Sequence, residues 1–409
     1  MPPPAIAGKG DPVTQTTVAR PTPDPVRLAW ALGLASAFGP FAIDMYLPAF
    51  PAIAAELSCP VGTVQMTLAV FLLGLAAGQV LWGSLSDRIG RRLPLLAGCL
   101  LFTLSSILCA LTDSIELLLL ARFVMGVAGS AGSVVPRAIV RDLFEEAEAA
   151  RFYALTMLIG GLAPVVAPVL GGLLFEAAGW RPIFWSIAAI GAASFVLTAA
   201  LVPETLSPAA ARPAGLLRTY AWVLSRRAFL APALALGCSF GMLFSYITSS
   251  SLVFITVYGV APGRFGLLFG AVSLVLYLGA LASRWLLLHR DPAALLRLAS
   301  LVAVAGGVGL VVCAWTGWGG FPLFFALLLV SLSNLGLLFP IVTAMTMQPF
   351  PAMAGAASAL LGILQFLIGA IAGALSGLIH DGTAVPMAVQ IALFALATWL
   401  LLGLAPARR

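Results

Sequence analysis

Charged residues are scarce in this chain. Of its 409 residues only 9% are charged, whereas 61% are hydrophobic and the mean hydropathy is +1.08. A typical soluble domain carries about 25% charged residues, so the composition excludes a soluble enzyme or a disordered protein as the class of this chain. The apolar runs are long and unbroken rather than short and alternating, which argues against an outer-membrane barrel. We therefore predict an all-α polytopic membrane protein.

Residues that hold metals, disulfides or nucleotides are also few. The chain has five cysteines and two histidines, and it lacks a CxxC pair. Four of the cysteines fall inside apolar runs, which is typical of small packing residues and excludes a disulfide framework or a zinc site. The only lysine is Lys9, so the Gly-rich Lys-Ser/Thr loop of an ATP-binding motif is absent. We expect no cofactor or metal, and we expect any transport to draw its energy from an ion gradient.

Twelve apolar runs are each long enough to cross a bilayer, which takes about 20 residues. They begin near Arg27, Val61, Leu93, Ile115, Phe152, Arg181, Ala228, Gly263, Ala293, Phe321, Ala354 and Val385. The loops between them are short, so neighbouring helices must run antiparallel. Residues 1–26 are rich in Pro, Thr and Ala and lack the apolar core of a signal peptide, so we expect a disordered cytoplasmic tail.

Lysine and arginine are distributed very unequally between the two sides of the predicted membrane. Eighteen of the 21 fall on the side of the N-terminal tail, and two, Arg181 and Arg264, fall on the opposite side. Cytoplasmic loops carry an excess of Lys and Arg, which predicts that both termini are cytoplasmic. The same rule explains the net charge of +6, so we expect no nucleic-acid partner.

The longest polar break between apolar runs covers residues 203–227 and divides the chain into two sets of six spans. We predict an N-terminal six-helix bundle over 27–205, a cytoplasmic linker over 206–227 and a C-terminal six-helix bundle over 228–409. Two halves of this kind are typical of transporters built from structural repeats. Because one chain supplies both halves, a monomer is expected to form the whole pathway.

Two ionisable residues stand out because they lie inside predicted spans, Asp44 in the first and Arg122 in the fourth. A charge at the bilayer centre costs about 2.5–3.5 kcal/mol on insertion scales, so it needs a partner or a wet cavity. Both residues lie roughly seven positions, or about 10 Å, from the same face of the membrane. We predict that they face one central cavity and act in proton coupling. The alternative is a static ion pair that only fixes helix packing.

A further set of polar or adaptable residues lies in apolar runs and could line such a cavity. Its members are Tyr46, Gln65, Met66, Tyr246, Asn334 and Gln365. Methionine and aromatic side chains suit varied apolar ligands. Each residue taken alone is more often a packing contact, and Tyr46 and Gln65 are favoured because of their expected position near Asp44.

The loop between the second and third spans, Gly83-Ser-Leu-Ser-Asp-Arg-Ile-Gly-Arg-Arg92, carries a dense pattern. Gly83 and Gly90 permit a tight turn. Asp87 can cap a following helix or meet a helix N-terminus, where the dipole favours a negative charge. Arg88, Arg91 and Arg92 would hold the loop on the cytoplasmic side. On composition alone the loop could be a simple charged anchor.

At this point the chain resembles a known family. Residues 83–92 match the signature loop GxLxDRxGRR of the major facilitator superfamily, and residues 120–129 resemble its LxxRxxxGxG motif with a buried arginine. The fifth span resembles the Gly/Pro-rich motif of antiporters through Pro164, Pro168, Gly171 and Gly172, although Ala167 stands where the usual Gly-Pro pair has glycine. Residues 44–51, 245–254 and 354–366 are similar to segments of the bicyclomycin-resistance (Bcr/CflA) subfamily.

The resemblance implies a proton-driven exporter of small amphipathic drugs in a bacterial inner membrane, whose two bundles rock about a central site. In that picture Asp44 exchanges protons, Arg122 tunes it, the loop at Asp87 locks one state, and the prolines and glycines let the fifth span kink and pack closely. An exporter of one endogenous metabolite, a proton-coupled importer and a non-transporting sensor remain alternatives. Asp44, Arg122 and the signature loop count against the sensor.

Overall fold

We describe a computed structural model, and the account covers residues 24–144, 146–206, 216–350 and 353–404. Over these residues the chain is helical and contains no strand. The first half comprises α1 (Pro25–Ser36), α2 (Phe38–Asp44), η1 (Leu47–Ala49), α3 (Phe50–Glu56), α4 (Val61–Ile89), α5 (Arg92–Leu111), α6 (Ile115–Leu143), α7 (Glu146–Ala178) and α8 (Arg181–Leu201). The second half comprises α10 (Arg227–Ser251), η2 (Leu252–Val257), α11 (Pro262–His289), α12 (Pro292–Thr316), α13 (Gly320–Ser333), α14 (Leu335–Met347), α15 (Ala354–Leu378) and α16 (Val385–Leu404).

Eleven of the described helical stretches are long and apolar enough to cross a membrane. The predicted starts agree with the helices to within two residues, except that α7 begins at Glu146, six residues before the predicted position. The expected disordered tail falls mostly on residues 1–23, which lie outside the described residues, and α1 already begins at Pro25. The expected linker contains a short helix, α9 (Leu216–Leu224), which packs on α10 and α15.

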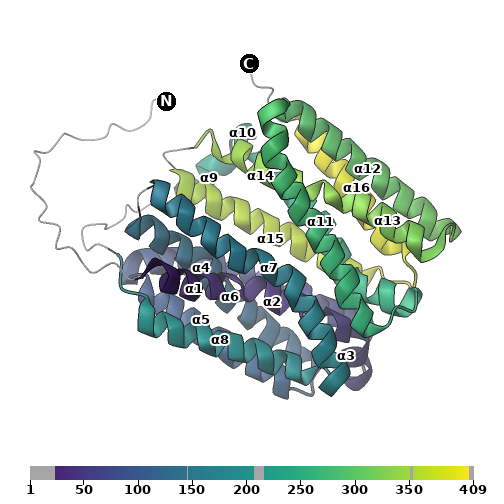
Figure 1. The fold of residues 1–409 in the computed structure, drawn as a ribbon, viewed down its shortest axis with the longest axis horizontal. Helices are drawn as coiled ribbons and strands as arrows, with labels where there is room; N and C mark the ends of the chain where they lie inside the picture. Colours follow the sequence, from purple (N-terminus) through teal and green to yellow (C-terminus); the bar gives the residue numbers. More distant parts are fainter. Residues whose placement is uncertain (1–23, 145, 207–215, 351–352, 405–409) are drawn as a thin grey trace, which may run out of the picture.

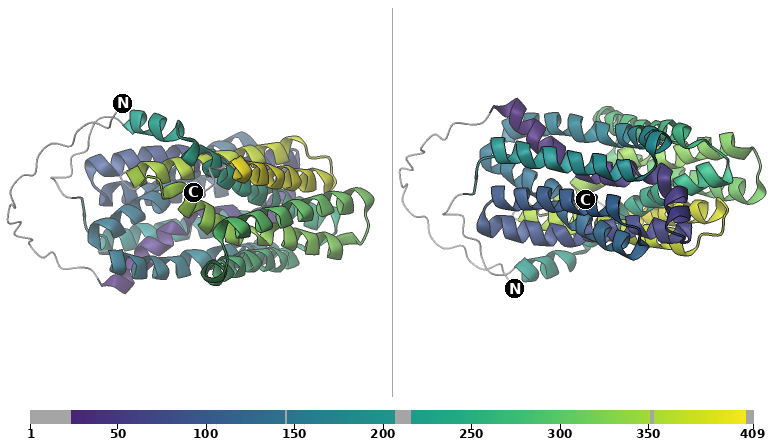
Figure 2. Two further views of the ribbon diagram at one scale, coloured as in Figure 1. Left: turned by 90° about the horizontal axis from the view of Figure 1, so that it is seen from above. Right: turned by 90° about the horizontal axis from the view of Figure 1, so that it is seen from below.

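The helices form two bundles that lie side by side (Figure 1). In the first, α6 packs against α4 and α5, and α8 packs against α5. In the second, α16 packs against α10 and α12, and α14 packs against α10 and α11. Figure 2 shows most of the long helices running roughly along the long axis of the molecule in both views. We call the end that holds the start of α1 and the end of α16 the terminal end, and the opposite end the far end.

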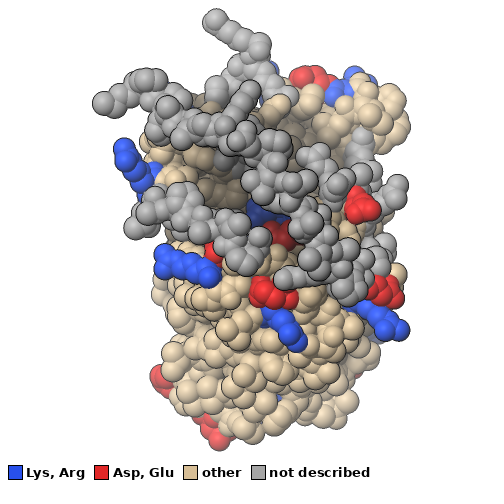
Figure 3. Space-filling view, turned by 90° about the vertical axis from the view of Figure 1, so that its left-hand side faces the viewer, with Lys and Arg blue, Asp and Glu red and all other residues tan. Residues whose placement is uncertain are grey.

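The two halves meet along two helix pairs, α4 with α15 and α7 with α11. At the far end the contact is intimate, because a Cβ on Gly62 of α4 would overlap the carbonyl of Gly377 in α15. Towards the terminal end α7 and α11 diverge (Figure 1). Figure 3 looks onto the terminal end, where arginine and carboxylate side chains lie on the surface. The halves are therefore in backbone contact at the far end, and α7 and α11 separate towards the terminal end.

The first span is broken into α1, α2, η1 and α3 because of its prolines. Pro48 has no N–H, so the carbonyl of Asp44 lacks its normal helical donor four residues later. A short 3-10 turn follows, in which the Ala49 N–H donates to the backbone carbonyl of Tyr46 at 3.0 Å. Asp44 is thereby placed at the end of α2, at a break in the middle of the span.

Candidate functional site

Asp44 is buried between the two halves without a full set of hydrogen bonds. Its side chain is only 4% exposed, and its Oδ1 has no hydrogen-bond partner. Just after Asp44, η1 packs against α10 of the second half, which carries the buried Tyr246. The Tyr246 hydroxyl is also buried and without a partner. Because an unpaired polar group inside an apolar region costs several kcal/mol, this pair is a strong candidate for a functional site.

Arg122 is fully buried within the first half and is surrounded by aromatic rings. Its guanidinium carbon lies 4.3 Å from the ring centroid of Tyr46 and 4.4 Å from that of Phe71. One nitrogen, Nη1, donates to Met125 Sδ at 3.1 Å, whereas Nε and Nη2 have no partner. Cation–π contacts of this kind are worth about 2 kcal/mol when desolvated, so rings rather than a carboxylate stabilise this charge.

Asp44 and Arg122 do not form an ion pair, which was the alternative to a shared cavity. Among the ion pairs of the described residues, none joins these two side chains. The helix ends at Asp44, and the ring of Tyr46, two residues later, lies over the guanidinium of Arg122. Both side chains are buried, and a static pair is not formed in this conformation. Their role in proton coupling stays a prediction.

Two of the remaining predicted cavity residues make specific contacts. Gln65 Nε2 of α4 donates to the carbonyl of Thr248 in α10 at 3.2 Å, which links the two halves, while its Oε1 has no partner. The Tyr46 hydroxyl shares a hydrogen bond of 3.0 Å with Thr67 Oγ1. Gln65 therefore belongs to the interface between the halves, whereas Tyr46 faces into the first half.

The other three predicted cavity residues are half-buried and make no hydrogen bond that links the two halves in the part of the chain that the structure describes. Met66 lies one residue after Gln65 on α4, and Gln365 lies in the middle of α15. Asn334 joins α13 to α14, and its Nδ2 donates to the carbonyl of Val330 at 2.9 Å. Asn334 therefore satisfies a carbonyl at a helix break.

The glycines of the fifth span hold α7 against both the first span and the second half. A Cβ on Gly171 would overlap the carbonyl of Met45, directly after Asp44. A Cβ on Gly172 would lie 3.3 Å from the carbonyl of Pro262, at the start of α11. Pro164 and Pro168 both lie within the helix. This part of α7 therefore positions the Asp44 break and touches the second half.

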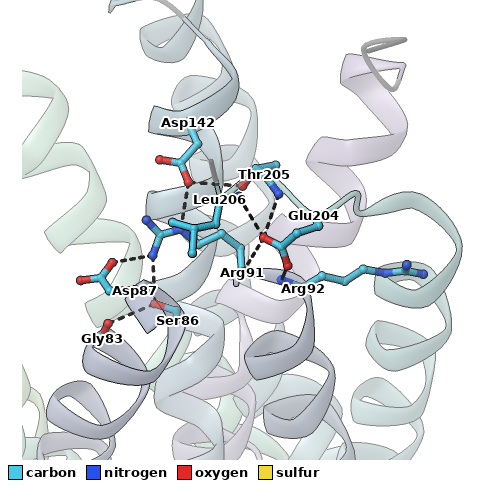
Figure 4. A network of polar contacts seen from close by, with 9 residues as sticks. All are labelled: Gly83, Ser86, Asp87, Arg91, Arg92, Asp142, Glu204, Thr205 and Leu206. Carbon is cyan, nitrogen blue, oxygen red and sulfur yellow. Dashed lines mark hydrogen bonds and ion pairs between the residues drawn. The ribbon is translucent and has the colours of Figure 1, made fainter. Parts of the chain in front are cut away.

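The signature loop is built around a buried arginine (Figure 4). The Arg91 side chain is only 1% exposed and donates to Asp87 Oδ1 at 2.6 Å and to Asp142 Oδ2 of α6 at 2.9 Å. It also donates to Ser86 Oγ at 3.2 Å, and the Ser86 hydroxyl in turn donates to the Gly83 carbonyl. Arg91 thus ties the end of α4 to the end of α6.

A second carboxylate, Glu204, completes this network, although it was not among the predicted site residues. Its Oε1 accepts the backbone N–H of Arg91 at 2.8 Å, and its Oε2 accepts that of Arg92 at 3.2 Å. It also accepts the N–H groups of Thr205 and Leu206. Burial tends to raise the pKa of Glu204, but these four donors outweigh it and hold that pKa below the ordinary value.

Glu204, rather than Asp87, therefore caps the N-terminus of α5, where a negative charge is favoured by the helix dipole. Gly90 has φ +105°, and a Cβ there would run into the Glu204 carboxylate, so glycine is required for this approach. Arg92 donates from Nη2 to the Ala199 carbonyl at 2.6 Å, and Arg88 is exposed. Two partners of Glu204, the backbone N–H groups of Arg91 and Arg92, lie more than a hundred positions away in sequence.

A model of the Major Facilitator Superfamily matches residues 32–374 of the chain. The chain is 38% identical over 367 residues to the uncharacterized MFS-type transporter YdgK of Bacillus subtilis. The matched region covers 88% of this chain and 90% of YdgK. It is 30% identical over 363 residues to the bicyclomycin resistance protein homolog of Haemophilus influenzae, with 87% and 90% covered. It is 28% identical over 326 residues to the multidrug resistance protein MdtL of Escherichia coli, with 80% and 82% covered.

Solved transporters share the same fold. A D-xylose-proton symporter superposes with a TM-score of 0.73 at 15% identity and covers 91% of this chain and 96% of its own. A bacterial homolog of the human lysosomal transporter Spinster, inward-facing and occupied, gives a TM-score of 0.71 at 15% identity, with 93% and 95% covered. The chain is a multi-pass membrane transporter and belongs to the Major Facilitator Superfamily, with relatives of the bicyclomycin-resistance type.

Proposed function

We propose that this protein exports antibiotics or similar small amphipathic compounds across the bacterial inner membrane in exchange for protons. Twelve spans with both termini in the cytoplasm would place the terminal end on the cytoplasmic side, as the distribution of arginines predicts. The two halves would rock about a central site and open it to each side in turn. The relatives named for bicyclomycin and multidrug resistance support the substrate class.

The observation that carries the proposal is the buried Asp44, whose Oδ1 has no hydrogen-bond partner and which directly precedes the segment that packs on α10 and α11 of the second half. An ionised carboxylate is costly in such a place, so Asp44 would hold its proton until substrate and water enter from the terminal end. Their entry would make the charged form less costly and release the proton to the cytoplasm, and opening at the far end would let Asp44 take up a new proton from the opposite side. Binding and release of a proton are thereby tied to which end is open.

Arg122 has a different role in this account. It supplies a fixed positive charge in the same half as Asp44, and aromatic rings rather than Asp44 compensate that charge in this state. Two of its donors are unpartnered. We propose that it modulates the proton affinity of Asp44 over distance and offers donors to acceptor groups in another state of the cycle.

The test is drug-induced proton movement in inside-out vesicles that contain the wild type or Asp44→Asn at equal expression. Chloramphenicol-like, bicyclomycin-like and cationic compounds are added after the lumen has been acidified. We expect proton release in the wild type and none in Asp44→Asn. The matched control is Asp381→Asn, because Asp381 is a carboxylate in an exposed far-end turn that bonds to Thr383, and it should release protons as the wild type does.

Release that survives in Asp44→Asn would move proton coupling to another group and leave the exporter standing. A wild type that responds to none of the compounds would contradict the drug assignment and favour a carrier for one metabolite.

A further inference from the structure

The pair α7 and α11 forms a seam of direct backbone contact between the halves. On the α11 side the seam is made of Gly263, Gly266 and Gly270, spaced so that they share one face of the helix. A Cβ on Gly266 would lie 2.7 Å from the carbonyl of Pro168, so glycine is needed for this approach. A Cβ on Gly270 would meet nothing closer than 3.7 Å. The seam is therefore tight near the far end and loosens towards the middle.

A backbone carbonyl in α7 lacks its normal partner beside this seam. In an α-helix the carbonyl of residue 164 accepts the N–H of residue 168. Residue 168 is proline, which has no N–H, so the carbonyl of Pro164 is left free inside α7. A free carbonyl at membrane depth is costly, and freed groups of this kind are satisfied by neighbouring helices or by hydroxyl side chains.

Ser273 of α11 brings a hydroxyl from the other half to this carbonyl, and shares its single proton between this carbonyl and one in its own helix. Its Oγ lies 3.3 Å from the carbonyl oxygen of Pro164 and 3.2 Å from that of Phe269 in its own helix. The first contact crosses the seam, and its two residues are 109 positions apart in sequence. The hydroxyl thus links a carbonyl freed by Pro168 in one half to a helix of the other half.

We propose that Ser273 is a positioning residue of the transport cycle, which holds the free Pro164 carbonyl across the seam and so stabilises the state closed at the far end. The inference rests on the proposed alternating function, but it makes a structural claim that can be tested without any substrate. It also assigns a role to both prolines of the fifth span. Pro168 removes the helical donor of the Pro164 carbonyl, and that carbonyl oxygen is the acceptor that Ser273 contacts.

A second polar contact lies nearer the far end on the same seam. Glu176 Oε1 of α7 accepts the N–H of Gly263 in the first turn of α11, at 2.8 Å. A Cβ on Gly263 would run into this carboxylate, which shows how closely the two groups approach. Loss of the Ser273 contact therefore leaves one polar link in place and should loosen the seam without separating the halves.

The experiment is hydrogen–deuterium exchange of the purified full chain in lipid nanodiscs, followed in peptides that cover the start of α11 and the end of α7. We expect Ser273→Ala to speed exchange there by about two- to tenfold, the factor that one hydrogen bond supplies. Ser273→Thr keeps the hydroxyl and should exchange as the wild type does. Peptides of α5 and α8, which lie away from the seam, serve as the internal control.

The decisive arm uses Pro168→Ala, which restores an N–H at residue 168 and lets α7 satisfy the Pro164 carbonyl by itself. In that background Ser273→Ala should have no further effect on exchange. Equal effects of Ser273→Ala in both backgrounds would overturn the proposal, because the hydroxyl would then act by packing alone. Unchanged exchange in Ser273→Ala would overturn it as well.

Transport separates this inference from the proposed function. If the wild type moves protons in response to drugs, Ser273→Ala should show a substrate-independent proton leak that is absent from the Pro168→Ala, Ser273→Ala double variant. A leak of equal size in both would contradict the role of Ser273. A wild type that moves no protons would contradict the proposed antiport, while the exchange data would still decide whether Ser273 holds the seam.

Discussion

At the scale of single residues, Glu204 shows how one carboxylate can hold a loop. It accepts four backbone N–H groups, from Arg91, Arg92, Thr205 and Leu206, although it lies outside the signature loop. We expect Glu204→Gln to lower the free energy of unfolding by about 1–3 kcal/mol, because the charge is lost from these hydrogen bonds. Thermal unfolding in detergent measures the change. Asp381→Asn, in an exposed turn, should leave the melting temperature unchanged.

The pH dependence of the same residue follows from its lowered pKa. A group whose pKa is lower in the folded state contributes stability above its ordinary value, and this stability is lost as pH falls through the folded value. The melting temperature of the wild type should therefore fall as the pH is lowered below the ordinary pKa of a glutamate. Glu204→Gln should lose less over the same range. Parallel acid profiles for the two proteins would contradict this reading of the network.

At the scale of elements, the contact of α7 with the broken first span positions Asp44. A Cβ on Gly171 would overlap the carbonyl of Met45, and backbone on both sides leaves no room to yield. We expect Gly171→Ala to destabilise the protein by about 1–3 kcal/mol or more, as overpacking does, and to impair proton coupling. Gly270→Ala, with its nearest neighbour 3.7 Å away, is the matched control. Equal melting temperatures for the two variants would contradict the packing argument.

The elements were also the part of the structure that the sequence predicted best. The helix starts could be predicted because a membrane helix is recognised by the length and hydropathy of its apolar run. Prolines, arginines and glycines mark the ends of these runs. The break at Asp44 was not predicted, although Pro48 is its cause. Asp44 and Arg122 were found because each is a lone charge in an apolar run. Glu204 and Ser273 were not among the predicted site residues, because the contacts that give them a role join segments more than a hundred residues apart.

At the scale of the whole molecule, the far end closes where α4 meets α15 through two glycines. A Cβ on Gly62 would overlap the carbonyl of Gly377, and a Cβ on Gly377 would meet the carbonyl of Gly62 at 2.5 Å. We expect Gly62→Leu to hold the halves apart at this end and to shift the population towards a far-end-open state. Hydrogen–deuterium exchange should rise in the far-end turns of α4 and α15. Gly39→Leu is the control, because a Cβ on Gly39 meets nothing within 4 Å.

The central claim is that the proton carried by Asp44 is exchanged for substrate. It is tested most directly by adding a transported compound to the purified protein in weakly buffered detergent and recording the pH. The account predicts that the wild type releases protons on binding, and that Asp44→Asn binds the compound without releasing any. Proton release that persists in Asp44→Asn, or a wild type that binds without releasing protons, would contradict the account.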